Sequence, residues 1–193
     1  MTFSPFDEVI NRHNTGSEKW DRYNGRDVIP MWVADMDFRS PPAVSEALQQ
    51  RIAHGVFGYT APTEELTQVV IDRLGRMYGW RVRPEWFIWL PGLVSALNAC
   101  CRAYTEPGEE VITFVPVYPP FLTAPLWSRR QRKTCPLRFE HGRWSIDFEQ
   151  FEAEISDKTR LVLWCHPHNP VGRVWSRAEM EQLADICQKH NLI

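Results

Sequence analysis

Long apolar segments are missing from this sequence. No uninterrupted run of 18 apolar residues occurs, so the length of its apolar runs excludes a membrane-spanning helix. The N-terminal stretch carries Asp7 and Glu8 where a secretory signal would need an apolar centre. The five cysteines form no C-x-x-C pair, and their odd number does not suit a disulfide framework. We therefore expect a cytoplasmic protein with reduced thiols.

A basic excess is also missing. The formal net charge is −2, whereas nucleic-acid binding usually needs a positively charged face. One dense basic run, RRQRK at residues 129–133, is interpreted as the solvated edge of a strand. The balance of 44% hydrophobic and 24% charged residues is that of a folded domain rather than a disordered chain. We expect neither a nucleic-acid nor a membrane partner.

The N-terminal third of the chain predicts an arm followed by two helices. Residues 1–40 show no hydrophobic period, so we predict an extended arm there. The first helix is predicted to start with Ser40 as its cap and Pro41 at its first position, and to stop near Gly55. The second is predicted to follow residues 60–62 and to end at Gly79, with apolar residues at helical spacing between them.

Strands and helices alternate in the rest of the sequence. Strands are predicted at residues 86–90, 110–115, 131–137 and 160–165, and helices at 93–104, 119–127, 147–154 and 176–190. Such alternation with short links predicts an α/β fold, a parallel sheet with helices on its faces. The last helix starts with Ser176 and Glu179 at the spacing of a capping box. The final residues, HNLI, look like the start of another buried strand.

Three of the predicted strands end in residues suited to binding a small molecule. In an open α/β sheet, ligands bind at the carboxyl ends of the strands. After the first strand, the amides of Leu93 and Val94 and the hydroxyl of Ser95 can bind a phosphate at a helix start. After the second, Tyr118 stands between prolines and can stack on a flat ring. After the fourth, Asn169 offers an amide donor.

Each of these features also has a plainer interpretation. Free amides occur in any strand–turn–helix, and Tyr118 could be a core residue whose hydroxyl is bonded. His166 and His168 could suggest a metal, but an H-x-H pair without a third ligand of clear spacing is a poor zinc signature. Cys165 directly precedes them and is expected to face the core. We predict no metal site.

Four segments together resemble one known family. They are PMWVADMDF at 30–38, VFGYT at 56–60, PVYPPF at 116–121 and HPHNPVGRVW at 166–175. They are similar to motifs of fold-type I pyridoxal-phosphate enzymes, in the cystathionine β-lyase-like branch of the class I/II aminotransferases, which includes the maltose-regulon modulator protein. The resemblance runs through the whole chain. It implies an N-terminal arm or small-domain segment at 1–40, and an incomplete large domain that binds pyridoxal 5'-phosphate at 41–193.

The resemblance implies a role for each residue at the three strand ends. Tyr118 matches the aromatic residue that stacks on the pyridine ring of the cofactor. Leu93 and Val94, through their amides, and Ser95 match the phosphate-binding turn. Asn169 matches the asparagine that bonds the phenolic oxygen of the ring. One cofactor needs all three features together, so they support one another.

Residues nearer the N-terminus also match the family. Tyr59 matches a tyrosine that reaches across a dimer to the neighbouring subunit's cofactor phosphate, which implies a homodimer for intact members. Ala34 and Asp35 match the segment that borders the substrate. The sequence departs from the family at His166, where the branch usually has asparagine, and we interpret this position as structural.

The resemblance further implies residues that this chain lacks. The lysine that forms the Schiff base, the aspartate that protonates the pyridine nitrogen and the arginine that binds the substrate carboxylate are expected beyond Ile193. The lysines present, Lys19, Lys133, Lys158 and Lys189, match no Schiff-base motif. We therefore expect a chain truncated within the large domain, without a catalytic residue and inactive by itself.

The function implied by the resemblance is that of a carbon–sulfur β-lyase. Such an enzyme converts an amino-acid thioether such as cystathionine to a thiol, pyruvate and ammonia. An aminotransferase is the alternative, because the same fold and cofactor carry out both reactions. A non-catalytic regulatory or binding protein is a further alternative, since the maltose-regulon relative also binds a transcriptional regulator. The last alternative is the remnant of a shortened gene.

Overall fold

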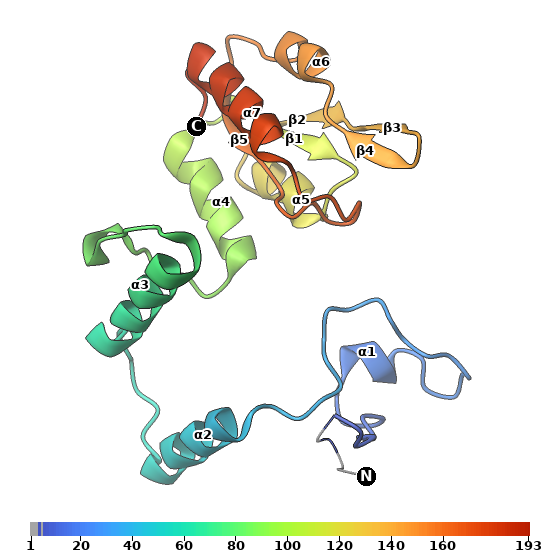
Figure 1. Cartoon of the computed structure of the whole chain (residues 1–193), viewed down its shortest axis with the longest axis vertical. Coiled ribbons are helices and arrows are strands. Elements are labelled where there is room, and N and C mark those ends of the chain that lie inside the picture. The colour runs from blue at the N-terminus through green and yellow to red at the C-terminus, as the bar shows by residue number, and fades with distance from the viewer. Residues whose placement is uncertain (1–3, 5) are drawn as a thin grey trace. The chain divides into compact units, whose positions relative to one another are not determined.

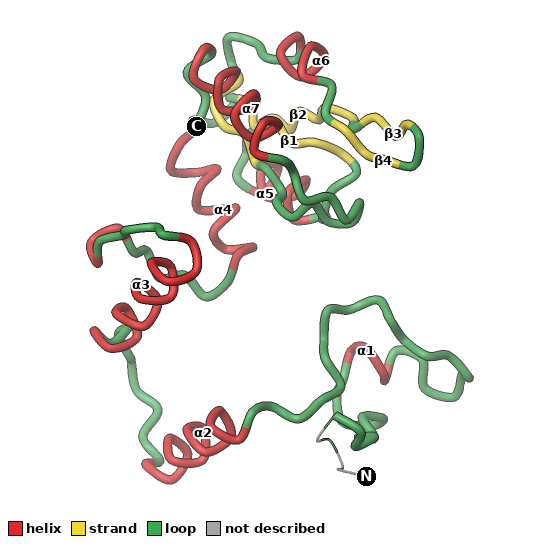
Figure 2. The backbone as a smooth tube through the Cα atoms, in the orientation of Figure 1, coloured by secondary structure: helices red, strands yellow, loops and turns green. Residues whose placement is uncertain are grey.

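The structure is a computed structural model that describes residue 4 and residues 6–193. The chain divides into two compact units, Met1–Ala61 and Pro62–Ile193, and each is described by itself (Figures 1 and 2). The division expected at residue 40 follows the domains of the resembled family rather than chain compactness, and it stays a prediction. None of the helices in the described residues is long and apolar enough to cross a membrane.

The described residues of the N-terminal unit form two helices joined by irregular chain. Helix α1 (Glu18–Asp21), which the sequence did not predict, is capped by the Ser17 hydroxyl accepting from the Trp20 amide. Helix α2 (Pro42–His54) ends, as predicted, at Gly55, whose φ of 75° suits glycine. The predicted start was wrong by one residue. Pro41 precedes a second proline, which drives it to an extended backbone, so Pro42 becomes the first helical residue.

The second unit opens with a helix and an unpaired extended segment. Helix α3 (Glu64–Tyr78) is capped by Thr63 and ends at Gly79, close to its predicted range. The strand predicted at 86–90 is wrong: a 3₁₀ turn, η1 (Pro84–Trp86), is followed by chain without a strand partner among the described residues. The Ile88 side chain is 82% exposed. A strand needs a neighbour for its amides and carbonyls, and apolar sequence alone does not supply one.

A three-stranded parallel sheet forms the centre of the second unit. Strands β1 (Glu110–Val115), β2 (Gln131–Pro136) and β5 (Thr159–Leu163) lie in the order β2-β1-β5, and both pairings are parallel. The parallel α/β fold predicted from the sequence is therefore confirmed. The four central residues of β1 are all buried, as expected for a strand covered on both faces.

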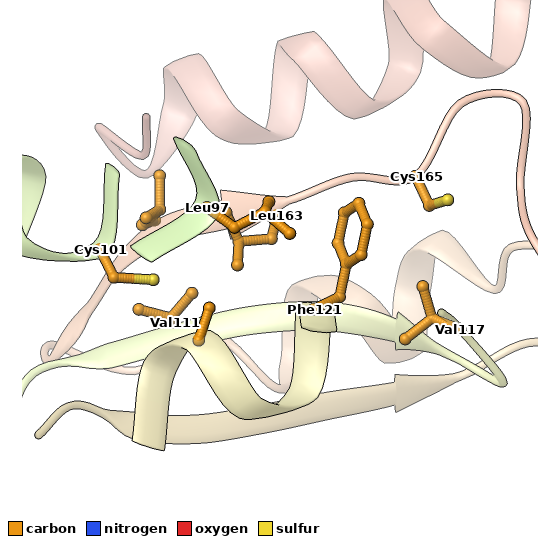
Figure 3. Packing of buried hydrophobic residues seen from close by; sticks show 9 residues of the cluster. Leu97, Cys101, Val111, Val117, Phe121, Leu163 and Cys165 are labelled. Atoms are coloured by element: carbon orange, nitrogen blue, oxygen red, sulfur yellow. The ribbon is translucent and has the colours of Figure 1, made fainter. Parts of the chain in front are cut away.

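Helices cover both faces of the sheet. Leu97 of α4 (Leu93–Tyr104) and Phe121 of α5 (Pro120–Trp127) pack against Val111 and Leu163 on one face, and Figure 3 shows these side chains pointing toward one another. On the other face, α6 (Phe148–Ala153) and α7 (Arg177–Lys189) pack against β1 and β2. The capping box predicted at the start of α7 is present.

Two further features concern the edges of the sheet. A hairpin of β3 (Arg138–Glu140) and β4 (Arg143–Ser145) was not predicted, because its strands are short and mostly polar. At the outer edge of β5, the Ile193 amide donates to the Arg160 carbonyl at 3.0 Å, and the Ile193 carbonyl accepts from the Val162 amide at 2.8 Å. Ile193 thus pairs with β5 in the manner of a parallel strand, which agrees with the expectation for HNLI.

Candidate functional site

The parallel sheet brings the carboxyl ends of β1 and β5 to one edge, where a cavity of about 500 Å³ lies. Among the predicted site residues, Leu93, Tyr118 and Asn169 line this cavity. Apolar residues from α4, α5 and β5, including Phe121 and Leu163, form much of the rest of the wall. The cavity is therefore apolar with a few polar groups, the usual composition of a small-molecule site.

Tyr118 follows β1 and presents an open aromatic surface to the cavity. Its backbone amide donates to the Asn169 carbonyl at 2.9 Å, which joins the two loops beyond the strands. Its side chain is 40% exposed, and its hydroxyl makes no hydrogen bond to any other described residue. Tyr118 is therefore not the buried tyrosine with a bonded hydroxyl that was the alternative interpretation. Its ring is free to stack on a flat ligand.

Asn169 follows β5 and has an uncommitted side chain. Its backbone amide contacts the Cys165 sulfur at 3.4 Å, and its carbonyl accepts from Tyr118. The side-chain amide is exposed and bonds to nothing else in the part of the chain that the structure describes. Asn169 can therefore donate to an oxygen of a ligand lying on Tyr118.

The start of α4 supplies unpaired backbone amides. The first amide of the helix to find a helical partner is that of Ala96, which donates to the Gly92 carbonyl at 3.1 Å. The amides of Leu93, Val94 and Ser95 precede it and have no helical carbonyl to bond. Leu93 lines the cavity, whereas Val94 and Ser95 do not. The helix end favours an anion, although the cavity includes only its first residue.

The two motif histidines have separate surroundings. The exposed His166 ring lines the cavity and stacks on Trp164, with ring centres 5.3 Å apart. The His168 ring is buried, and its Nε2 lies 3.0 Å from the Pro116 carbonyl. No group of three or more His, Cys, Asp or Glu side chains that could hold a metal occurs within the described residues. Cys165 is buried in the core, as predicted.

The remaining predicted residues lie in the N-terminal unit. Tyr59 is fully exposed in the loop after α2. The Asp35 carboxylate accepts from Arg12 Nη2 at 2.8 Å, and this bond lowers the Asp35 pKa. The Asp35 carbonyl accepts from Lys19 Nζ at 2.8 Å. The carboxylate and the carbonyl of Asp35 are therefore both hydrogen-bonded within the chain, and Ala34 is exposed.

Sequence reasoning missed the centre of this network, Asp37. Its carboxylate accepts from Lys19 Nζ at 2.7 Å, from Trp20 Nε1 at 2.8 Å and from Arg12 Nη1 at 2.8 Å. These bonds, that from Lys19 foremost, hold the Asp37 pKa well below its usual range. The partners lie 17 to 25 residues away in the sequence, so no local spacing indicates the network. Asp37 fixes the segment that contains Ala34 and Asp35.

The cavity suits the cofactor implied by the sequence resemblance. A flat ring can stack on Tyr118, a ring oxygen can accept from Asn169, and an anionic group can lie near the start of α4. The volume of about 500 Å³ is within the range of cofactor pockets. The fold and cavity together have the architecture of α/β domains that bind ligands beyond the carboxyl ends of their strands.

Comparison with known proteins places the chain within this class. Residues 26–193 match the family model described as Aminotransferase class I and II, and the chain belongs to that family. It is 41% identical to the cystathionine beta-lyase PatB of Bacillus subtilis, with 97% of this chain and 50% of the relative covered. It is 30% identical to the protein MalY of Escherichia coli, with the same coverage of both chains.

Solved structures support the same relationship. Cystalysin from Treponema denticola, whose crystal structure contains pyridoxal 5'-phosphate, matches with a TM-score of 0.88 and 38% identity. The match covers 96% of this chain and 49% of cystalysin. The chain thus has the fold of about half of a fold-type I enzyme, and it spans about half the length of the curated relatives it matches.

Proposed function

We propose that this chain carries cofactor-binding residues of a pyridoxal-phosphate-dependent carbon–sulfur β-lyase. The observation that carries the proposal is the meeting of Leu93, Tyr118 and Asn169 at one cavity. Similarity to a cystathionine beta-lyase supports the reaction type, and the cofactor in cystalysin supports the ligand. The whole reaction would convert an amino-acid thioether to a thiol, pyruvate and ammonia.

The chain's own residues bind and orient in this proposal. Tyr118 stacks on one face of the ring, and Asn169 donates to the ring oxygen. The phosphate is bound by the amides at the start of α4 and the Ser95 hydroxyl, of which only Leu93 borders the cavity. Leu163 and Phe121 in the cavity wall limit the access of water. Pyridoxal phosphate, when bound, supplies an electron sink that stabilises negative charge on the substrate's α-carbon.

The lysines support binding without turnover by this chain alone. No lysine lines the cavity between the strand ends of the described structure. Lys19 is bonded to Asp37 in the N-terminal unit, Lys133 to Glu110 and Lys189 to Glu152. Lys158 is exposed in the turn before β5, at the amino end of the strands rather than the carboxyl end. The amine that would join the cofactor covalently and accept the substrate's α-proton is therefore expected outside these 193 residues.

Titration of the purified chain with pyridoxal phosphate tests the binding site. We expect saturable quenching of tryptophan fluorescence, and a Kd about tenfold higher for Tyr118→Ala because the stacked ring is lost. Tyr104→Ala is the matched control, since Tyr104 is exposed at the opposite end of α4 and should leave the Kd unchanged. Equal affinity of Tyr118→Ala and the unmodified chain would remove the basis of the proposal.

A second measurement tests the covalent step. Borohydride treatment of the loaded chain should leave no cofactor attached to the protein, as read by intact mass. Cystathionine should release no thiol with this chain alone. Attachment at any lysine, or thiol release, would contradict the absence of a covalent anchor.

An aminotransferase is the second candidate, because the matching family model bears that description. Products distinguish the two reactions in a protein that also contains the other half of the fold. Pyruvate and ammonia from cystathionine favour the lyase, whereas an amino group passed to a 2-oxo acid favours the aminotransferase. The residues of this chain bind the same cofactor in both cases.

The exposed apolar surface of α2 supports a second copy of the chain as partner. Val44, Leu48 and Ile52 lie four residues apart on one face and are all exposed. The exposed Tyr59 follows in the next loop, where the family resemblance implies contact with a neighbouring subunit. Sedimentation should show a dimer that Leu48→Glu dissociates. A monomer at all concentrations would contradict the proposed pairing.

A further inference from the structure

Two loops at the candidate site are held together at a second point beyond the Tyr118–Asn169 bond. His168 Nε2 lies 3.0 Å from the carbonyl oxygen of Pro116, which stands two residues before Tyr118. His168 itself directly precedes Asn169. One residue therefore joins the backbone that carries the proposed stacking ring to the backbone that carries the proposed amide donor.

The His168 ring is firmly fixed in its own loop. The His168 amide donates to the Arg173 carbonyl at 2.7 Å, and the His168 carbonyl accepts from the Gly172 amide at 2.8 Å. The ring packs edge-on against Trp175, with ring centres 5.5 Å apart. Trp175 is buried, and its Nε1 donates to the Cys165 carbonyl at 3.2 Å. These contacts give the imidazole a defined position from which to hold the Pro116 carbonyl.

The hydrogen-bonding state of the ring follows from its partner. The Pro116 carbonyl can only accept, so Nε2 carries a proton and donates. The other ring nitrogen, Nδ1, is buried and bonds to no other described residue. Burial without a partner costs free energy that an apolar side chain of similar size would avoid. Packing alone therefore does not account for a histidine here, whereas a donor aimed at Pro116 does.

We propose that His168 is a positioning residue, which holds the Pro116 carbonyl and thereby fixes Tyr118 relative to Asn169. The inference deepens the proposed function and rests on it for the identity of the ligand. It assigns His168 no contact with the cofactor and no part in proton transfer. The imidazole acts through the backbone of the loop after β1.

Three variants separate the donor from the packing. His168→Leu fills the buried space but cannot donate, whereas His168→Gln places an amide nitrogen where Nε2 lies. His141→Asn is the control, since His141 is exposed in the β3–β4 turn at a φ of 51°, which asparagine tolerates. Should the leucine variant fail to fold by circular dichroism, His168→Asn replaces it, because its amide is too short to reach Pro116.

The first readout is hydrogen exchange at the Tyr118 amide, which needs no cofactor. We expect exchange about two- to tenfold faster in His168→Leu, with the central amides of β1 unchanged and near-normal exchange in His168→Gln. The second readout is the Kd for pyridoxal phosphate, expected to rise by a similar factor in His168→Leu and to recover in His168→Gln.

The outcomes distinguish this inference from the proposed function. If the unmodified chain does not bind pyridoxal phosphate, the proposed function fails, while the exchange measurement still decides the role of His168. If the chain binds but His168→Leu changes neither readout, the positioning role is overturned. Equal defects in His168→Gln and His168→Leu would also overturn it, because packing rather than the donor would then be responsible.

Discussion

The two compact units of this chain are held in place by different interactions. The buried core residues of the second unit are apolar side chains packed on both faces of the β2-β1-β5 sheet. In the described part of the N-terminal unit no residue belongs to either apolar cluster, and the buried side chains include Ser17 and Lys19. Several of its contacts between distant segments instead involve the carboxylates of Asp35 and Asp37.

This difference predicts different sensitivities. Apolar burial is roughly proportional to the area removed from water and varies little with modest changes of pH. Partly exposed ion pairs depend on ionisation and are screened by salt. Loss of carboxylate charge and added salt should therefore act mainly on the N-terminal unit, and changes of packing mainly on the second. The buried His168 is the exception, because it makes the second unit sensitive to acid near neutral pH.

The largest expected effect is on the core of the second unit. Phe151 of α6 is fully buried and packs on Phe114 of β1, with ring centres 5.0 Å apart. Phe151→Ala should lower the free energy of unfolding of this unit by about 3–5 kcal/mol, measured by urea denaturation. Phe139→Ala, in the exposed β3–β4 hairpin, is the control and should cost much less. Equal losses would mean that the sheet core is not what stabilises this unit.

The next effect is on the network of the N-terminal unit. Asp37→Asn removes the charge that Lys19 and Arg12 share, and Lys19 is then left largely buried without its ionic partner. We expect the Trp20 indole NH signal, which reports the bond to Asp37, to move to its unstructured position in an NMR spectrum. Glu8→Gln, which breaks only the exposed pair with Arg39, should leave that signal in place.

The parts of the fold that could be predicted from the sequence are those with local causes. The limits of β1 and α4 follow from apolar runs and from the prolines and glycines that interrupt them. The Ser176–Glu179 capping box involves residues only three apart. The strand predicted at 86–90 failed because a strand depends on a neighbour that sequence composition does not specify. Asp37 was missed because its partners are distant in sequence.

The candidate site was predictable to a similar extent. That Tyr118 and Asn169 lie at one edge follows from the parallel sheet, because the carboxyl ends of parallel strands point the same way. The separate surroundings of His166 and His168 did not follow from their spacing. The His168 ring is directed by Trp175 and Pro116, which only the folded chain brings together.

As the pH falls, the second unit should lose stability before the N-terminal unit does. Burial lowers the His168 pKa, opposed by its bond to Pro116, so its neutral form stabilises the second unit above the unfolded-state pKa of about 6.5. That stability is lost as pH falls from about 6.5 through the lowered pKa, by up to about 1.4 kcal/mol per pH unit. The nearby Arg173 and Glu179 are paired with each other. His168→Gln should flatten this part of the pH profile of urea denaturation.

The N-terminal unit should respond only at lower pH. The pKa values of Asp35 and Asp37 are lowered by their bonds to Arg12 and Lys19, respectively. Their stabilising contribution is therefore present above the unfolded-state pKa of about 3.9 and is lost below it. The His13 ring packs edge-on against Trp20, with ring centres 5.0 Å apart, so the measurement uses a His13→Gln variant. In that variant the Trp20 indole signal should stay constant between about pH 6.5 and pH 4 and change only at more acidic values. A change in that signal near pH 6 would contradict the assignment of this unit's order to the two carboxylates.

Added salt should give the smallest effect of these changes, and it should weaken the N-terminal unit more than the second. The side chains of Arg12, Asp35 and Asp37 are partly exposed, so their attraction weakens as the screening length falls from roughly 10 Å at 0.1 M to roughly 3 Å at 1 M salt. Sodium chloride at about 1 M should therefore speed solvent exchange of the Trp20 indole proton. It should change the urea midpoint of the second unit little, because apolar burial is not screened and exposed ion pairs such as Lys189–Glu152 contribute little to stability. If the Trp20 proton were unaffected while the sheet weakened, the proposed difference between the units would be reversed.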